Sequence, residues 1–311
     1  MTFNVLVSTR FFDPAAEQLL RDNGCTIITT GLAHDVQDDV LDHDRLSALL
    51  EGVDGWVVGT VPVTEALMQA HPRLKVIARR GVGYNNVDIK AARALNKHVT
   101  IASGGNEAAV ADHAVAMFLS LAKKLKESHQ ALQDGRWSTF VSTELFEKTV
   151  GLIGFGRIAR GVAKRVKGFD AKVLAYDPFA DAKAVADHGV NLTSLEELLA
   201  TSDYVSLHLP YSKDTRHIIN ADRLAQMKAG AFLINTARGG LIDEEALLHA
   251  LTSGHLGGAG LDVFENEPDL NDPNVKGLLV HPHVVATAHA AGSSEEGLQR
   301  TNKIAAQTVI D

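Results

Sequence analysis

Three ionisable side chains stand where apolar segments of this chain end. Arg238 follows the apolar run 232–235, and two glycines behind it permit a sharp turn. A guanidinium there can grip a carboxylate bidentately, which a lysine cannot do. Glu267 and His289 follow two later apolar runs, and histidine is the natural proton donor near neutral pH. The set predicts carboxylate binding with proton transfer; the alternative is a surface arginine paired with an acid and solvated loop acids.

A glycine turn earlier in the chain predicts nucleotide binding. The apolar run 149–153 leads into Gly154-Phe155-Gly156 and a helical pattern, and Asp177 lies 23 residues after Gly154. The first glycine permits a tight turn, Gly156 lets the backbone approach a pyrophosphate, and the small Ala159 lets the helix pack closely on the strand. An acid at this spacing binds a ribose 2′-hydroxyl and repels a 2′-phosphate. The predicted cofactor is therefore NAD, the alternative being a purely structural turn.

These two features define one chemistry. NAD moves hydride, so the protein has to hold a substrate and supply one proton. Reduction of a 2-oxo acid needs a cation for the carboxylate and an acid for the carbonyl oxygen, which Arg238 and His289 offer. Asp262, at the end of the apolar run 257–261, could face the nicotinamide. The spacing of His281, His283 and His289 matches no standard zinc pattern, so we predict no metal.

Composition excludes several classes of protein. The 311 residues suffice for two domains, and the net charge of −8 argues against nucleic-acid binding. No apolar run approaches the length of a membrane helix, and the N-terminus is predicted to be a strand rather than a signal peptide. The single Cys25 excludes an internal disulfide and fits a reducing compartment. We therefore expect a cytoplasmic protein without membrane or nucleic-acid partners.

Short apolar runs alternate with helical patterns along the whole chain. The predicted strands span 4–8, 25–30, 56–58, 74–78, 99–102, 149–154, 172–176, 204–209, 231–236, 257–263 and 283–287. The predicted helices span 13–23, 45–51, 64–70, 87–96, 107–133, 195–200, 244–251 and residues from 293 onward. This alternation predicts an α/β protein with two doubly wound parallel sheets. Only the second half carries the full glycine pattern, so the cofactor is assigned to it.

The long helical segment 107–133 is apolar at its start and charged at its end. We interpret it as a bridge out of the first domain followed by an exposed arm that packs on a partner subunit; the alternative is a helix buried in its own domain. No Pro/Ser-rich linker is present in the sequence, so the domains should connect through short crossings and leave a cleft between them.

Taken together, these motifs resemble the D-isomer-specific 2-hydroxyacid dehydrogenases, which include D-3-phosphoglycerate dehydrogenase, glyoxylate and hydroxypyruvate reductases, and D-lactate dehydrogenase. The resemblance covers nearly the whole chain and rests on the segments 80–88, 149–159, 205–210, 235–240, 260–268 and the turn at His289. It implies a Rossmann cofactor domain, 103–286, inserted into a discontinuous flavodoxin-like substrate domain, 1–102 plus 287–311. It further implies a homodimer, with 107–137 as linking helix and dimer arm.

The resemblance also implies residue roles. His289, paired with Glu267, would donate the proton to the carbonyl of a small 2-oxo acid. Arg238 would bind the carboxylate, helped by the backbone N–H groups of Val82 and Gly83. The implied NAD-binding positions are Gly154, Gly156, Arg157, Ile158, Asp177, His208, Leu209, Pro210, Thr236, Ala237 and Asp262.

Three departures from the family pattern matter for substrate choice. Ala159 replaces the third glycine, and Ala288 replaces a proline before the histidine. The stretch 57–60 lacks the Arg-Ser pair that often helps phosphoglycerate dehydrogenases hold the substrate phosphate, although Arg79 and Arg80 could serve instead. The chain stops at Asp311, so we expect no extra regulatory domain. The alternatives are an NAD-sensing corepressor and a formate or phosphite dehydrogenase of the same fold.

Overall fold

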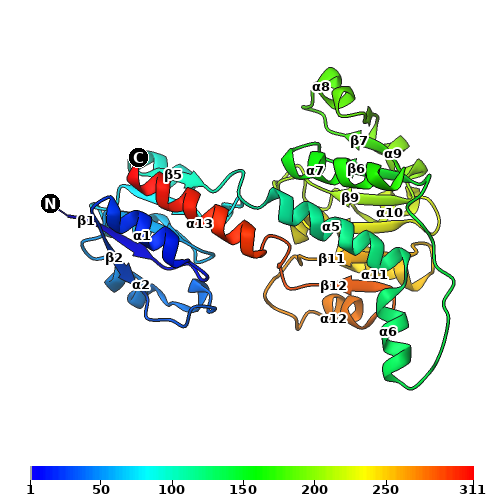
Figure 1. Ribbon diagram of the computed structural model, residues 1–311, viewed down its shortest axis with the longest axis horizontal. Coiled ribbons are helices and arrows are strands. Elements are labelled where there is room, and N and C mark those ends of the chain that lie inside the picture. Colours follow the sequence, from blue (N-terminus) through cyan, green and yellow to red (C-terminus); the bar gives the residue numbers. More distant parts are fainter. Residues whose placement is uncertain (1) are drawn as a thin grey trace. The chain divides into compact units, whose positions relative to one another are not determined.

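The computed structural model describes residues 2–311, and the chain divides into two compact units (Figure 1). The first unit combines the segment that ends at Asn106 with the C-terminal segment Gly292–Asp311, and the second is Glu107–Ala291. The chain therefore crosses between the units after residues 106 and 291, whereas the sequence placed the crossings after residues 102 and 286.

The first unit contains a five-stranded parallel sheet with the order β2-β1-β3-β4-β5, which is the flavodoxin-like order. Its strands are β1 (Phe3–Val7), β2 (Cys25–Thr29), β3 (Gly55–Val58), β4 (Val76–Arg79) and β5 (His98–Ile101). Its helices are α1 (Pro14–Asp22), α2 (His43–Leu50), α3 (Glu65–Ala70), α4 (Ile89–Ala94) and α13 (Glu295–Ile310), with a 3-10 turn at Asp38–Val40.

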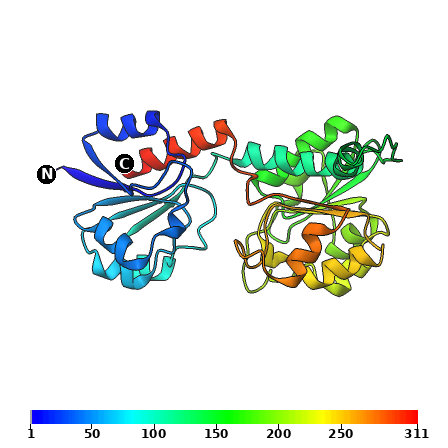
Figure 2. The ribbon, with the colours of Figure 1, turned by 90° about the horizontal axis from the view of Figure 1, so that it is seen from below.

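Local sequence signals set where these helices begin. The side chains of Asp13, Asp42, Thr64 and Asp88 each accept a backbone N–H three residues later, so they cap α1, α2, α3 and α4. One buried cluster, centred on Trp56, fills the face of the sheet covered by α2, α3 and α4. A second cluster lies under α1 and α13 on the opposite face (Figure 2).

The second unit contains a seven-stranded sheet with the order β12-β11-β10-β9-β6-β7-β8, again parallel throughout. Its strands are β6 (Thr149–Ile153), β7 (Lys172–Tyr176), β8 (Asn191–Leu192), β9 (Tyr204–Leu207), β10 (Phe232–Asn235), β11 (Gly258–Leu261) and β12 (Val284–Ala286). Counted from β6, this is the Rossmann order with one further strand at the β12 edge.

Helices cover both faces of the second sheet (Figure 2). One apolar cluster lies under α5 (Glu107–Ala122) and α7 (Arg157–Val166), and the other under α9 (Leu195–Thr201), α10 (Ala221–Gln226), α11 (Glu244–Thr252) and α12 (Pro273–Val280). The remaining helices are α6 (Leu125–Gln133) and α8 (Ala182–Asp187), and 3-10 turns lie at Lys167–Phe169 and Gly239–Leu241. The sequence did not predict β8, α8, α10 or α12.

The prediction of a single helix over 107–133 is wrong, because this segment forms two helices. The backbone leaves the right-handed helical region at Lys124, whose φ is 52°. The Ala122 carbonyl accepts the Thr143 N–H at 2.9 Å instead of continuing a helical ladder. The apolar part of the segment becomes α5, which is buried in the second unit, and the charged part becomes α6. Within residues 2–311, no helix is long and apolar enough to span a bilayer.

The returning helix α13 is tied to the N-terminal part of the first unit by a buried amide. Asn302 is 0% exposed, and its Nδ2 donates to the Phe11 carbonyl and to the Asp13 carboxylate, both at 2.7 Å. We expect Asn302→Ala to lower the free energy of unfolding by about 1–3 kcal/mol, because a buried carbonyl loses its donor. Urea denaturation measures the change, with the exposed Gln307→Ala on the same helix as control; equal midpoints for the two variants would contradict it.

Candidate active site

The predicted site residues of the second unit lie at one edge of its sheet. The registers pair Ile153 with Tyr176 and Leu207, and Asn235 with Leu207 and Leu261. The carboxyl ends of these parallel strands are therefore level with one another. The predicted residues follow them directly: Gly154–Ile158 after β6, Asp177 after β7, His208–Pro210 after β9, Thr236–Arg238 after β10, Asp262 after β11 and His289 after β12.

The turn between β6 and α7 leaves space for a ligand at one glycine and none at the other. Gly154 has a φ of +91°, and a Cβ there would lie 2.8 Å from the His208 carbonyl oxygen. A Cβ on Gly156 would meet nothing within 4 Å. Gly156 is the N-cap of α7 and carries no capping side chain, and the positive end of a helix dipole favours an anion. The loops after β6 and β9 meet at the point where strand order reverses, which is where α/β sheets bind ligands.

Asp177 is held against this turn by backbone donors. Its Oδ2 accepts the Phe155 N–H and its Oδ1 accepts the Phe179 N–H, each at 2.9 Å. The carboxylate is thus fixed beside the glycine turn at the end of β7, as expected for a group that recognises a ribose hydroxyl.

Two buried polar atoms at the same edge lack partners within the described part of the chain. These are His208 Nε2 and Thr236 Oγ1. Burial also lowers the pKa of His208 to about 3, so its imidazole stays neutral. Because an unpaired buried polar atom is costly, a polar ligand at this edge would satisfy what the protein leaves unpaired. The open Gly156, the fixed Asp177 and these two atoms fit a dinucleotide.

His289 and Glu267 form a close pair. His289 Nδ1 donates to Glu267 Oε1 at 2.6 Å, which leaves Nε2 for another partner. Burial acts to raise the pKa of Glu267, but the hydrogen bond and charge of His289, the Phe264 N–H and the charge of Arg238 lower it overall. Glu267 therefore stays ionised at neutral pH and holds the imidazole in one orientation.

Arg238 lies between β10 and the 3-10 turn Gly239–Leu241. Its Nη1 donates to the Ala237 carbonyl at 2.5 Å. Burial lowers the pKa of Arg238 while the nearby Glu267 raises it, and burial has the larger effect. A guanidinium remains protonated even so. The site therefore combines a partly desolvated cation with an ionised acid and a histidine.

Asp262 has a structural task that the sequence did not reveal. It is 1% exposed, and its carboxylate accepts the Thr287 hydroxyl at 2.5 Å and the N–H groups of Ala290 and Ala291 at 2.8 and 3.0 Å. The Asp262 carbonyl accepts the His289 N–H at 2.7 Å. These bonds hold the turn that presents His289, whose φ of 48° lies in the left-handed region. They depend on tertiary contacts that spacing does not show.

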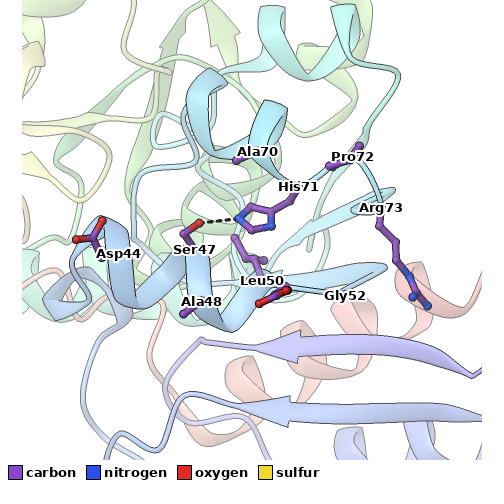
Figure 3. Close-up of a pocket in the computed structure, with 10 residues that line it drawn as sticks. Asp44, Ser47, Ala48, Leu50, Gly52, Ala70, His71, Pro72 and Arg73 are labelled. Atoms are coloured by element: carbon purple, nitrogen blue, oxygen red, sulfur yellow. Dashed lines mark hydrogen bonds between the residues drawn. The ribbon is translucent and has the colours of Figure 1, made fainter.

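The first unit contributes two further features. Val82 and Gly83 lie in the loop that follows β4. A recess of about 480 Å³ opens between α2 and the end of α3, where Ser47 Oγ and His71 Nε2 are 2.9 Å apart (Figure 3). Among the described residues that line the recess, none is a predicted site residue.

Comparison with known proteins identifies the family. Residues 115–291 match the model described as "D-isomer specific 2-hydroxyacid dehydrogenase, NAD binding domain". The chain is 40% identical over 269 residues to hydroxypyruvate reductase of Thermotoga maritima, covering 86% of this chain and 87% of that protein. It is 40% identical over 271 residues to D-3-phosphoglycerate dehydrogenase of Mycobacterium tuberculosis, covering 86% and 51%. The chain thus spans about half the length of the curated phosphoglycerate dehydrogenases that it matches.

A solved structure agrees with these sequence matches. The structure of D-lactate dehydrogenase from Aquifex aeolicus, complexed with NAD and lactic acid, superposes with a TM-score of 0.84 at 32% identity, covering 98% of this chain and 94% of that one. The chain belongs to the D-isomer specific 2-hydroxyacid dehydrogenase family. Its second unit carries the family's NAD-binding domain, which confirms the fold and the cofactor predicted from the glycine turn.

The network around Asp262 makes a prediction about the His289 turn. Asp262→Asn should lower the free energy of unfolding by about 1–3 kcal/mol, because an amide has one acceptor oxygen for three donors and turns an N–H group toward the others. Hydrogen exchange at Ala290 and Ala291 should accelerate in parallel. Asp269→Asn, an exposed acid of the same segment, serves as control, and unchanged exchange at both amides would show that Asp262 does not hold the turn.

Proposed function

We propose that this chain is an NAD-dependent dehydrogenase that interconverts a small D-2-hydroxy acid and its 2-oxo acid. The observation that carries the proposal is the 2.6 Å pair between His289 and Glu267, which lies at the same sheet edge as Arg238 and the dinucleotide turn. Membership of the family supports the reaction class.

The residues of the site divide the tasks of this mechanism. The bound nicotinamide supplies or accepts the hydride. Arg238 binds the substrate carboxylate and polarises the carbonyl. The substrate-binding role of the backbone N–H groups of Val82 and Gly83 stays a prediction. In reduction, His289 gives its proton from Nε2 to the carbonyl oxygen. Glu267 orients the imidazole through Nδ1 and stabilises the protonated ring before transfer. The implied NAD-binding positions keep their predicted roles.

Asp177 supports NAD over NADP as the physiological cofactor. Its carboxylate is fixed by the Phe155 and Phe179 N–H groups, so it cannot swing away from an added phosphate without breaking both bonds. A fixed negative charge at this position repels a 2′-phosphate.

The turn after β3 favours a substrate without a phosphate. Asp38 is 1% exposed, and its carboxylate accepts the N–H groups of Gly59, Thr60 and Val61 at 2.7, 2.7 and 3.1 Å. These donors are therefore already used by a negative charge of the protein. Arg80 lies in the same unit, and its Nε donates a hydrogen bond to Thr9 Oγ1 at 2.7 Å. Burial lowers the pKa of Arg80 to about 10, and the charges of Arg79 and Arg10 act in the same direction.

The experiment that tests the function is NADH oxidation against a panel of 2-oxo acids: glyoxylate, hydroxypyruvate, pyruvate, 2-oxobutyrate and phosphohydroxypyruvate. We expect turnover with at least one unphosphorylated acid and weaker turnover with phosphohydroxypyruvate. Preference for the phosphorylated acid would contradict the inference from Asp38. Absence of turnover across the panel, with NADH binding confirmed by fluorescence, would contradict the enzymatic role and favour an NAD sensor.

The roles of His289 and Arg238 give a separate prediction. His289→Asn should lower kcat by about 10²–10⁴-fold while NADH still binds, because proton transfer is lost; asparagine also tolerates the left-handed backbone. Arg238→Lys should raise KM and lower kcat, because the bidentate grip is lost. Steady-state kinetics and NADH titration measure both, and wild-type turnover in His289→Asn would exclude His289 as the proton donor.

A homodimer and a cytoplasmic location complete the proposal. The segment formed by α6 and the residues after it carries large apolar side chains that the chain itself leaves exposed: Leu125 56%, Leu132 55%, Trp137 93%, Val141 89% and Phe146 53%. Exposed apolar groups in one segment are typical of a protein interface. Figure 1 shows α6 at the periphery of the second unit, where a second copy can reach it. The single Cys25 supports a reducing compartment.

The dimer makes its own prediction. The double variant Trp137→Ser/Val141→Ser should shift the protein from dimer to monomer, because two large apolar side chains are removed from the proposed interface. Light scattering coupled to size-exclusion chromatography measures the mass. Val40→Ser, which changes a residue that is 64% exposed in the first unit, should leave the mass unchanged. A monomeric wild-type protein would refute the proposal.

A further inference from the structure

We propose that His217 and Glu265 are positioning residues that lock the loop of Arg238 to the loop of Glu267. The inference rests on the proposed function, because it assigns a purpose to the spacing between the carboxylate-binding arginine and the acid that orients the proton donor. Neither residue belongs to the predicted site.

The carboxylate of Glu265 accepts hydrogen bonds from two side chains. Glu265 binds neither the substrate nor the cofactor in the proposed mechanism. Its Oε2 accepts His217 Nε2 at 2.9 Å, and its Oε1 accepts Arg216 Nη2 at 3.0 Å. Its backbone N–H donates to Glu244 Oε1 at 2.7 Å. The side chains of His217 and Glu265 are 29% and 25% exposed, so water screens this pair only partly.

His217 joins two loops at once. Its backbone N–H donates to the Gly240 carbonyl at 2.8 Å, in the turn that follows Arg238, while its ring binds Glu265 in the loop that follows β11. The backbone of His217 is left-handed, with a φ of 48°. A non-glycine residue whose backbone is kept in this unfavourable region is held there by its surroundings.

The two loops also touch directly at Gly239. A Cβ there would lie 1.9 Å from the Phe264 carbonyl carbon and 2.3 Å from the Glu265 nitrogen. The backbone next to Arg238 therefore rests on the backbone next to Glu265 with no space for a side chain. This contact fixes how closely the loops approach, and the pair from His217 to Glu265 holds them in that contact.

The position of Glu265 is transmitted to Glu267 through one turn. The Phe264 N–H donates to Glu267 Oε2 at 3.2 Å, and the Glu267 N–H donates to the Phe264 carbonyl at 3.4 Å. A shift of the Phe264–Glu265 backbone therefore moves the carboxylate that orients His289. Errors of about 1 Å in such an arrangement can cost about 10²-fold in rate.

The charges in this cluster keep Glu265 ionised. Burial acts to raise the pKa of Glu265, but the hydrogen bonds and charges of His217 and Arg216 lower it overall. Burial raises the pKa of Glu244, whose Oε1 accepts the Glu265 N–H. Glu265 therefore carries the charge that His217 and Arg216 bind.

The test compares Glu265→Ala and Glu265→Gln with wild type, using a 2-oxo acid that the wild type reduces. Glu265→Ala should lower kcat about tenfold to a hundredfold and change the KM for the oxo acid by less than about threefold, because Arg238 still binds the carboxylate. The dissociation constant of NADH should stay within about twofold. Glu265→Gln keeps one acceptor oxygen and should recover part of kcat. Asp187→Ala, which removes an exposed ion pair with Lys183 in the same unit, is the control and should match wild type.

A second measurement does not depend on turnover. The imidazole Nδ1–H of His289, bonded to Glu267, is assigned by NMR as the resonance missing from His289→Asn. It should weaken or vanish in Glu265→Ala and persist in Asp187→Ala. If the wild type reduces no oxo acid, this signal still tests the positioning while the proposed function fails separately. The inference is overturned if Glu265→Ala keeps wild-type kcat and the Nδ1–H signal, or if kcat, NADH affinity and melting temperature all fall together, which would indicate general unfolding.

Discussion

The parallel arrangement of the second sheet is the constraint on which the candidate site depends. Each neighbouring strand pair from β12 to β7 runs in the same direction with level ends, so six loops emerge at one edge. Residues separated by more than a hundred positions, such as Gly154 and His289, are thereby placed at the same edge without any long connecting segment. Loops can then carry chemistry because the strands beneath them are rigid and buried.

The candidate residues at this edge could be selected from the sequence because their signals are local. Each signal is contained within about ten residues: a glycine turn after an apolar run, an arginine before two glycines, and a histidine after a strand. The pairing of Glu267 with His289 was implied by the resemblance to the family, not by spacing. The distance of 2.6 Å between them follows from packing and could not be predicted.

What the sequence failed to predict depends on contacts between distant loops. Asp262 stands at the end of β11 like a ligand-binding acid, yet both of its oxygens accept donors from the His289 turn. The break at Lys124 could not be predicted because the helical pattern continues through it. The N–H group that binds the Ala122 carbonyl comes from Thr143, in a segment with no periodic pattern. Glu265 resembles a solvated acid in a run of acids, and its contacts with His217 and Arg216 distinguish it in the structure.

Two histidines at this edge are held in a strained backbone conformation. His217 and His289 both have a φ of 48°, and a non-glycine residue in such a region costs about 1–3 kcal/mol. Each directs its backbone N–H to one loop and its ring to a glutamate: His289 to Asp262 and Glu267, His217 to Gly240 and Glu265. These hydrogen bonds, from the backbone and from the ring, hold both residues in the left-handed region.

The segment 264–267 therefore acts as a shared support for three loops. Glu265 binds His217 in the loop after β9, Glu267 binds His289 in the turn after β12, and the Phe264 backbone lies against Gly239 in the turn after β10. A single flexible acid would suffice to neutralise His289, but it would not fix the imidazole relative to Arg238. Because hydride and proton must reach adjacent atoms of one carbonyl group, that relative position matters more than either charge alone. Glu265 and Glu267 together tie the loop after β11 to the loops after β9 and β12.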